Sequence, residues 1–231
     1  MLTGPHFSPA RLEAVRARIA AAERRAGREP GSVRLLAVSK QQPLEAIEAA
    51  ALAGQLEFGE NYVQEGVAKV EALRGRPLTW HFIGRLQGNK SREVAEHFQW
   101  VHTVDRERIA TRLDAQRPPL APPLEVLLQV RLGDEPAKGG ATPQELPWLA
   151  DAVGGLPRLK LRGLMCIPPP ASDEAAQRAP FRRLRELLED LNRRGHALDV
   201  LSMGMSDDLE AAVLEGATLV RIGTAIFGPR D

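Results

Sequence analysis

Residues 33–40 read VRLLAVSK, and the meaning of this apolar run ending on a serine and a lysine determines how the rest of the chain is interpreted. The aliphatic stretch from Val33 to Val38 is typical of a buried strand. Lys40 follows it directly. It either reaches solvent there, as lysines beside strands often do, or lies at the mouth of a site and reacts through its amine. The neighbours of this strand decide between the two interpretations.

Strand-like runs alternate with amphipathic, helix-like segments from this point to the end of the chain. The predicted strands are Val33–Ser39, Leu56–Gly59, Thr79–Ile83, Trp100–Thr103, Glu125–Val130, Leu159–Ile167, Val200–Ser202 and Thr218–Ile222. Such alternation predicts an α/β fold, with a parallel sheet covered by helices. Closing eight strand–helix units gives a (β/α)8 TIM barrel, and a doubly wound open sheet is the competing architecture.

An additional helix is predicted before the first strand. Ser8 followed by Pro9 is typical of a helix start, and an apolar stripe with helical spacing continues until Gly27. We expect residues 1–30 to pack as an N-terminal helix on the barrel. We also expect residues 1–231 to form a single domain.

The composition limits the classes of function. A hydrophobic fraction of 43% and a charged fraction of 26% are typical of a globular protein, and a net charge of +1 gives no basic field that would recruit nucleic acid. The longest apolar runs are too short to span a membrane, and the N-terminus lacks the apolar core of an export signal. Cys166 is the only cysteine, which fits a reducing cytoplasm.

Polar and reactive residues collect where the predicted strands end. In a TIM barrel this is the end that carries function, because the loops after the strands meet there. The residues concerned are Lys40, Glu60, Asn61, His81, His102, Thr103, Met165 and Cys166, together with the loops LSMGMSDD at 201–208 and VRIGTAIFG at 220–228.

The two glycine-containing loops predict a phosphate site. Gly204 beside Ser202 lets the backbone approach a ligand closely, and Gly223 followed by Thr224 is typical of a short helix start whose free N–H groups can hold a dianion. Barrels often bind phosphate in the loops after strands seven and eight. Tight turns without a ligand would give the same pattern.

Lys40 beside a phosphate site suggests a phosphorylated aldehyde as ligand. A partly buried lysine has a lowered pKa, and the neutral amine forms a Schiff base with an aldehyde. The aldehyde is either a sugar phosphate, as in aldolases, or pyridoxal 5′-phosphate. Arg221, inside the last strand, requires a partner, and a pyridine nitrogen or a structural carboxylate would serve.

Three other conspicuous residues are interpreted as structural. His81 and His102 lie in predicted strands, where histidines are usually hydrogen-bonded core residues. No His, Cys or Asp spacing suggests a metal site. Cys166 is interpreted as a small core residue, because nothing nearby in sequence would lower its pKa.

Six ordered motifs together closely resemble the pyridoxal phosphate homeostasis protein family. They are AVSK (37–40), FGENYVQE (58–65), WHFIGRLQGNKSR (80–92), RGLMCIP (162–168), LSMGMSDD (201–208) and VRIGTAIFG (220–228). The resemblance runs from about Val33 to the C-terminus. It implies the barrel fold of the alanine racemase N-terminal domain without that enzyme's second β-domain.

The resemblance also implies a role for each matching position. Lys40 would carry pyridoxal 5′-phosphate as an internal aldimine, and Arg221 would face the pyridine nitrogen. The remaining implied contacts are Asn61, His81 and Met165 around the ring, and Ser202, Met203, Gly204, Gly223 and Thr224 at the phosphate.

These implications predict a protein that holds and hands on the cofactor rather than an enzyme with robust turnover. An arginine on the ring nitrogen makes the cofactor a poor electron sink, because a guanidinium does not give up its proton. Racemisation also requires a second acid–base group, and the only tyrosine is Tyr62. We expect a cytoplasmic monomer that regulates free cofactor, with apo-enzymes as acceptors. The alternatives are an amino-acid racemase of the same fold and a Schiff-base sugar-phosphate aldolase.

Overall fold

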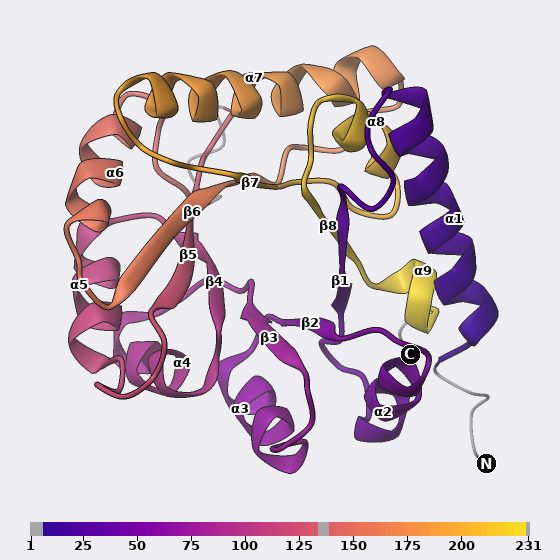
Figure 1. Ribbon diagram of the computed structural model, residues 1–231, viewed down its shortest axis with the longest axis horizontal. Helices are drawn as coiled ribbons and strands as arrows, with labels where there is room; N and C mark the ends of the chain where they lie inside the picture. The colour runs from indigo at the N-terminus through magenta and orange to yellow at the C-terminus, as the bar shows by residue number, and fades with distance from the viewer. Residues whose placement is uncertain (1–6, 134–138, 230–231) are drawn as a thin grey trace.

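Eight parallel strands close into a barrel in chain order in the computed structural model, which describes residues 7–133 and 139–229 (Figure 1). The strands are β1 (Arg34–Val38), β2 (Glu57–Glu60), β3 (Thr79–Phe82), β4 (Trp100–Val104), β5 (Leu124–Gln129), β6 (Leu159–Met165), β7 (Val200–Ser202) and β8 (Leu219–Ile222). Because β1 pairs with β8 as well as with β2, the sheet has no edge. The predicted barrel is confirmed, and the open sheet is excluded.

Helices surround the barrel. They are α1 (Pro9–Arg25), α2 (Leu44–Leu52), α3 (Val63–Ala72), α4 (Ser91–His97), α5 (Glu107–Gln116), α6 (Leu146–Gly154), α7 (Glu174–Arg193), α8 (Leu209–Leu214) and α9 (Thr224–Phe227), with a 3-10 turn η1 (Gly88–Lys90) before α4. Each strand is followed by a helix, and the one after β8 is the single turn of α9. The described residues contain no second domain.

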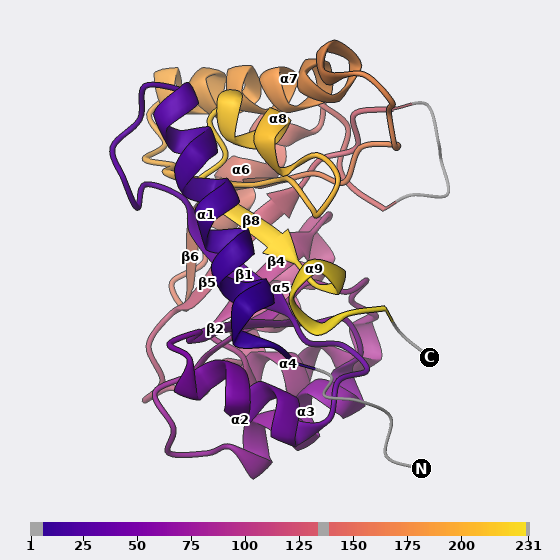
Figure 2. The same cartoon turned by 90° about the vertical axis from the view of Figure 1, so that its right-hand side faces the viewer.

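The predicted N-terminal helix is present as α1. Pro9 occupies its first turn, where no backbone N–H is needed, and an apolar face of Leu12, Val15, Ile19 and Ala22 is buried. This face packs against α8 and α9, so that α1 closes the side of the barrel on which the chain ends (Figure 2). Residues 1–6 and 230–231 of the predicted domain lie outside the described residues.

The strand register places three predicted ligand loops side by side. Ala37 of β1 pairs with Ile222 of β8, and Ser202 of β7 pairs with Leu219 of β8. The chain therefore leaves β7, β8 and β1 at the same end of the barrel, in adjacent positions. Lys40 and both glycine loops follow these three strands.

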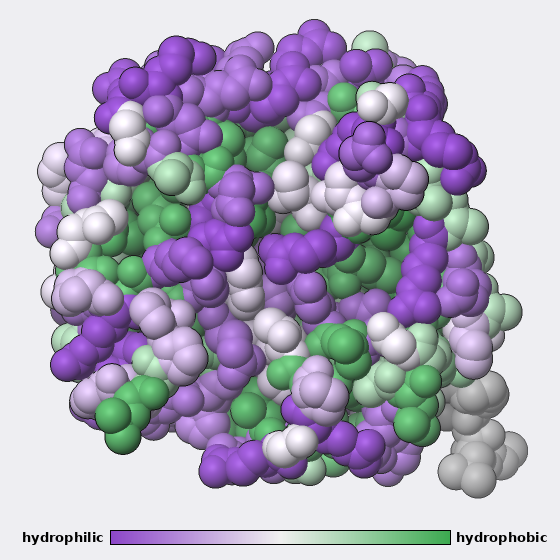
Figure 3. All heavy atoms as spheres, in the orientation of Figure 1, coloured by the Kyte–Doolittle hydropathy of each residue, from purple (hydrophilic) through white to green (hydrophobic). Residues whose placement is uncertain are grey.

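The face of the molecule seen down the barrel is largely polar (Figure 3). Hydrophilic residues cover much of the face seen down the barrel, and apolar residues show mainly in the recesses between them (Figure 3). In the described parts of the chain, no helix combines the length and the apolar character needed to cross a membrane.

Candidate functional site

Lys40 lies half-buried in a tight turn directly after β1. The backbone N–H of Ser39 still donates to Gly59 O of the neighbouring strand at 3.0 Å, and the N–H of Gln42 closes the turn on Ser39 O at 3.0 Å. Between them Gln41 has φ 61°, which is the left-handed region that side chains with a Cβ rarely adopt. The backbone on both sides of Lys40 is thus held in one unusual shape.

A buried ionic cluster holds the backbone of this turn. It consists of Ser39, Glu60, Glu65 and Lys69, and we call it the lysine-loop cluster. Lys69 Nζ donates to Ser39 O at 2.7 Å, to Glu60 Oε1 at 2.9 Å and to Glu65 Oε1 at 2.6 Å. Ser39 Oγ donates to Glu60 Oε1 at 2.6 Å, and the N–H of Gln41 donates to Glu65 Oε1 at 2.5 Å. Both neighbours of Lys40 in sequence are therefore tied to a single ammonium group.

Lys69 and Glu65 were not predicted from the sequence as part of the site. Lys69 belongs to α3, and its side chain is only 7% exposed although it is charged. Burial raises the pKa of the Glu60 carboxyl, and Lys69 partly offsets this effect. The available signal was Lys69 on the buried face of an amphipathic helix, four residues after Glu65.

The glycine loops after β7 and β8 form a backbone-lined corner beside this turn. Gly204 has φ 95°, and a Cβ there would lie 2.6 Å from Ala212 Cβ, so only glycine fits. A Cβ on Gly223 would lie 3.3 Å from Val38 O at the end of β1. Thr224 begins the single turn of α9, whose first N–H groups have no preceding helical carbonyl to bond. The corner therefore offers amide donors to an anion.

Arg221 supplies the buried cation of the site. It is 4% exposed, and it donates through Nη1 to Ser202 Oγ at 2.8 Å and through Nη2 to Cys166 O at 2.9 Å. Burial lowers the pKa of this guanidinium, which remains a pure donor. Within residues 7–133 and 139–229, Arg221 forms no ion pair with a carboxylate. Its remaining N–H groups can bind an acceptor atom of a ligand.

The barrel interior behind Arg221 is polar rather than filled only with branched aliphatic side chains. Ser202 Oγ lies 2.9 Å from His102 Nδ1, and His102 Nε2 lies 2.9 Å from His81 Nδ1. Both imidazoles are fully buried, and His81 Nε2 lies 3.3 Å from Glu57 Oε2. We call Glu57, His81, His102, Ser202 and Arg221 the histidine chain.

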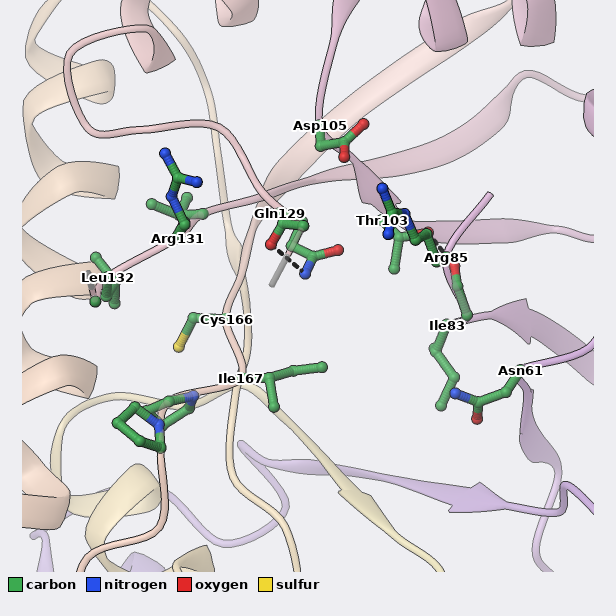
Figure 4. A pocket seen from close by; sticks show the side chains of 16 residues that line it. Asn61, Ile83, Arg85, Thr103, Asp105, Gln129, Arg131, Leu132, Cys166 and Ile167 are labelled. Atoms are coloured by element: carbon green, nitrogen blue, oxygen red, sulfur yellow. Dashed lines mark hydrogen bonds between the residues drawn. The ribbon is translucent and has the colours of Figure 1, made fainter. Parts of the chain in front are cut away.

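A cavity of about 280 Å³ opens at the ends of β2 to β6 (Figure 4). Arg221 does not line it, but its Nη2 donates to the backbone oxygen of Cys166, which does. Asn61 and Ile83 frame one side of it, and Arg131 and Leu132 frame the opposite side. The Oδ1 atom of Asn61 is buried without a hydrogen-bond partner among the described residues. The cavity therefore combines apolar walls with an unused acceptor, which suits a small ring with polar substituents.

The structure does not bring all of the predicted residues to the cavity. Asn61 lines it, whereas Lys40, Arg221 and the two glycine loops are not among its lining residues. His81 lies deeper in the barrel, and Met165 is buried in a cluster that includes Trp100. The Ser202 hydroxyl is already bonded within the histidine chain. The Met203 side chain is fully buried, and its backbone N–H donates to Leu219 O at 3.1 Å.

Cys166 lines the cavity but is not a nucleophile. Its side chain is 1% exposed, and burial raises the pKa of its thiol to about 12. A thiol that stays protonated at neutral pH is inert, as the sequence analysis expected. Its contribution to the site is the backbone oxygen that holds Arg221.

Comparison with known proteins gives consistent results at three levels. Residues 10–231 match the family model described as "Alanine racemase, N-terminal domain". The chain is 59% identical to the pyridoxal phosphate homeostasis protein of Pseudomonas aeruginosa over 217 residues, which cover 94% of this chain and 93% of the relative. It is 55% identical to the protein of the same name from Escherichia coli, with 95% of each chain covered.

Solved structures agree with these relatives. The PipY protein of Synechococcus elongatus with PLP bound is 41% identical, and the alignment has a TM-score of 0.81 and covers 91% of this chain and 100% of that one. The alanine racemase of Corynebacterium glutamicum is 18% identical, with a TM-score of 0.66 over 93% of this chain and 60% of the racemase. The second similarity concerns the barrel fold alone.

Proposed function

The chain belongs to the pyridoxal phosphate homeostasis protein family, and from that membership we propose that it binds pyridoxal 5′-phosphate, holds it covalently through Lys40 and regulates its free concentration, and thereby amino-acid and keto-acid pools. The observation that carries the proposal is the adjacency of β7, β8 and β1. The chain leaves these strands at one end of the barrel, which supports a site formed by Lys40, the two glycine loops and Arg221.

The residues present fit each part of this cofactor. The aldehyde requires an amine, which Lys40 supplies. The phosphate requires backbone donors in a corner free of side chains, and Gly204, Gly223 and Thr224 supply it. A pyridine nitrogen requires a donor, and Arg221 has further N–H groups beside those bonded to Ser202 Oγ and Cys166 O. Asn61 Oδ1 is a buried acceptor without a partner in the described chain.

The chemistry that the cofactor supplies when bound is electron withdrawal from a carbon attached to its imine nitrogen. Arg221 limits this chemistry, because a permanently protonated guanidinium donates to the ring nitrogen without transferring a proton. Tyr62, the one tyrosine that could act as a second acid–base group, is 53% exposed and lies at the N-cap of α3. We therefore propose that the protein stores and delivers the cofactor without robust turnover, as a monomer, with apo-enzymes as acceptors.

Reduction with borohydride tests the proposal directly. Purified protein mixed with pyridoxal 5′-phosphate is expected to show a visible absorption band that borohydride removes, with the label mapped to Lys40 by peptide mass analysis. Lys40→Ala should lose the label completely. Lys160→Ala, at a half-exposed lysine beside Glu125 at the other end of the barrel, should retain it. Labelling of Lys160 or of Lys69 in place of Lys40 would refute the assignment.

The same samples separate storage from racemisation. Incubation with an L-amino acid should leave its optical activity unchanged in the loaded wild-type protein. Loss of optical activity that disappears in Lys40→Ala would instead establish the racemase alternative.

A further inference from the structure

The histidine chain runs through the barrel interior from one end to the other. Arg221 stands at its ligand end, and Glu57, the first residue of β2, stands at the opposite end. The side chains come from five different strands, so no local sequence pattern produces the chain. An apolar side chain could fill the space that His81 or His102 occupies, and it would need no hydrogen-bond partner. The two histidines are therefore not explained by packing.

The two ends determine the direction of every hydrogen bond between them. The ionised Glu57 carboxylate only accepts, so His81 carries its proton on Nε2, which faces Glu57 Oε2 at 3.3 Å, and its Nδ1 accepts. His102 then carries its proton on Nε2 and donates to His81 Nδ1, so that its own Nδ1 accepts from the Ser202 hydroxyl. Arg221 has only donors, so Ser202 Oγ accepts from it while donating to His102.

The contacts at the Glu57 end of the histidine chain support this direction of the hydrogen bonds. Neither His81 Nε2 nor Glu57 Oε2 has another hydrogen bond to a described residue, and the two atoms lie 3.3 Å apart, with Arg34 Nη1 3.5 Å from the same oxygen. Burial raises the pKa of Glu57, but His81 and Arg34 together lower it below its ordinary value, so the carboxylate is ionised and accepts only. Burial lowers the pKa of both histidines, which keeps them neutral with one proton each.

We propose that Glu57, His81 and His102 are positioning residues for Arg221, which act by orienting the Ser202 hydroxyl so that the guanidinium is held in one place facing the ligand. The proposal rests on the proposed function only for the identity of the atom that Arg221 meets, the ring nitrogen of the cofactor. The hydrogen-bond direction is a property of the protein alone.

The geometry shows why such support is needed. A buried guanidinium normally pairs with a carboxylate that fixes its plane, but Arg221 has a hydroxyl and a backbone carbonyl instead. The Ser202 O–H bond can rotate, so its oxygen lone pairs face Arg221 only when the hydroxyl proton is donated to another acceptor. That acceptor is His102 Nδ1. His81 in turn is fixed by stacking on Trp100, with ring centroids 5.3 Å apart and planes 10° from parallel.

Histidine tautomers in the ligand-free wild-type protein provide the first test. Nitrogen-15 NMR of labelled histidine distinguishes an Nε2–H from an Nδ1–H ring. We expect His81 and His102 both to be neutral Nε2–H tautomers at neutral pH. An Nδ1–H tautomer or an imidazolium at either position overturns the proposal, and this measurement requires neither a variant nor the cofactor.

Two substitutions at one position provide the second test. His102→Leu leaves the Ser202 hydroxyl without an acceptor, whereas His102→Gln offers an amide oxygen in its place. We expect His102→Leu to shift the absorption band of the loaded protein and to weaken cofactor binding about tenfold, and His102→Gln to restore both. His97→Leu, which removes a histidine of α4 bonded to Glu93 O outside the barrel, should change neither.

The outcomes distinguish failure of the positioning role from failure of the proposed function. A folded His102→Leu protein with an unchanged band and affinity overturns the positioning role. If that variant does not fold, the tautomers of the wild type decide the question. A wild-type protein without any borohydride-sensitive band refutes the proposed function, while the tautomer result continues to test the chain.

Discussion

The turn that carries Lys40 and the strand that carries Arg221 both rest on buried polar side chains, but the support beneath Lys40 is ionic and the support behind Arg221 is neutral. In the lysine-loop cluster one ammonium, Lys69, holds two carboxylates and a backbone carbonyl. In the histidine chain two uncharged imidazoles separate Arg221 from Glu57.

The difference follows from what each support holds. A turn in a strained conformation needs hydrogen bonds at several of its backbone atoms. A buried ammonium with three acceptors provides strong, charge-assisted bonds for this purpose. Arg221 instead has to keep its charge for a ligand. A carboxylate against it would satisfy the guanidinium and compete with the ligand atom, whereas a hydroxyl oriented by a neutral imidazole leaves the charge available.

The largest effect that the comparison predicts is the loss of the ammonium in the ionic cluster. Lys69→Met removes the ammonium that pairs with the buried Glu60 carboxylate at 2.9 Å. We expect the free energy of unfolding to fall by about 3–5 kcal/mol, measured by urea denaturation. Glu60→Gln should lower it by only about 1 kcal/mol, since Lys69 keeps Glu65 at 2.6 Å.

The matched control for this prediction is Lys160→Met. Lys160 is 58% exposed and lies 3.5 Å from Glu125, so its loss should change the free energy of unfolding by less than about 0.5 kcal/mol. Equal effects at Lys69 and Lys160 would show that the cluster does not hold the turn, and the contrast between the two supports would disappear.

The neutral support predicts a smaller effect that depends on pH. Burial lowers the pKa of His81 and His102 in the folded protein, so below the ordinary histidine pKa of 6.5 the unfolded chain binds protons that the folded chain does not. Stability is therefore complete above pH 6.5 and is lost as the pH falls, by up to about 1.4 kcal/mol per pH unit for each histidine.

Thermal unfolding between pH 7.5 and 5 measures this dependence. His102→Gln removes one of the two titrating groups, and we expect it to reduce the slope between pH 6.5 and 5.5 by about half. A slope identical to that of the wild type would mean that His102 is protonated in the folded protein, and that the support behind Arg221 is charged after all.

The fold was predictable from the sequence to a far greater extent than these two supports. Aliphatic runs such as 33–38 identify strands because burial on both faces requires continuous apolar residues, and the loops at Gly204 and Gly223 were found because glycine has a local conformational meaning. The partners of His102 lie 21 and 100 residues away in the chain. Their contact is created by barrel closure and register, which no local pattern encodes.

The lysine-loop cluster was missed for a related reason. Glu60 and Lys69 lie on a strand and on the following helix, nine residues apart, and a surface ion pair would look the same in sequence. What distinguishes the cluster is that α3 covers the turn after β1, a contact between one unit of the barrel and the next. The periodicity of apolar residues predicts each strand and helix, but it does not predict which loop each helix covers.

The smallest predicted effect concerns the strain that the ionic cluster holds in place. Gln41 is the one residue other than glycine with a left-handed φ in the described parts of the chain, and it is exposed. Gln41→Gly removes about 1–2 kcal/mol of backbone strain but adds about 0.5–1 kcal/mol of entropy to the unfolded chain. We expect a net gain of up to about 1 kcal/mol in the free energy of unfolding, measured by urea denaturation.

The control for Gln41 is an exposed glutamine with an ordinary backbone. Gln144→Gly, in the turn before α6, should destabilise the protein by about 0.5–1 kcal/mol, because there the substitution only adds entropy to the unfolded chain. If both substitutions destabilise equally, the turn after β1 is relaxed rather than strained. Lys69 would then stabilise a conformation that the chain adopts without it, and the ionic support would be no more demanding than the neutral one.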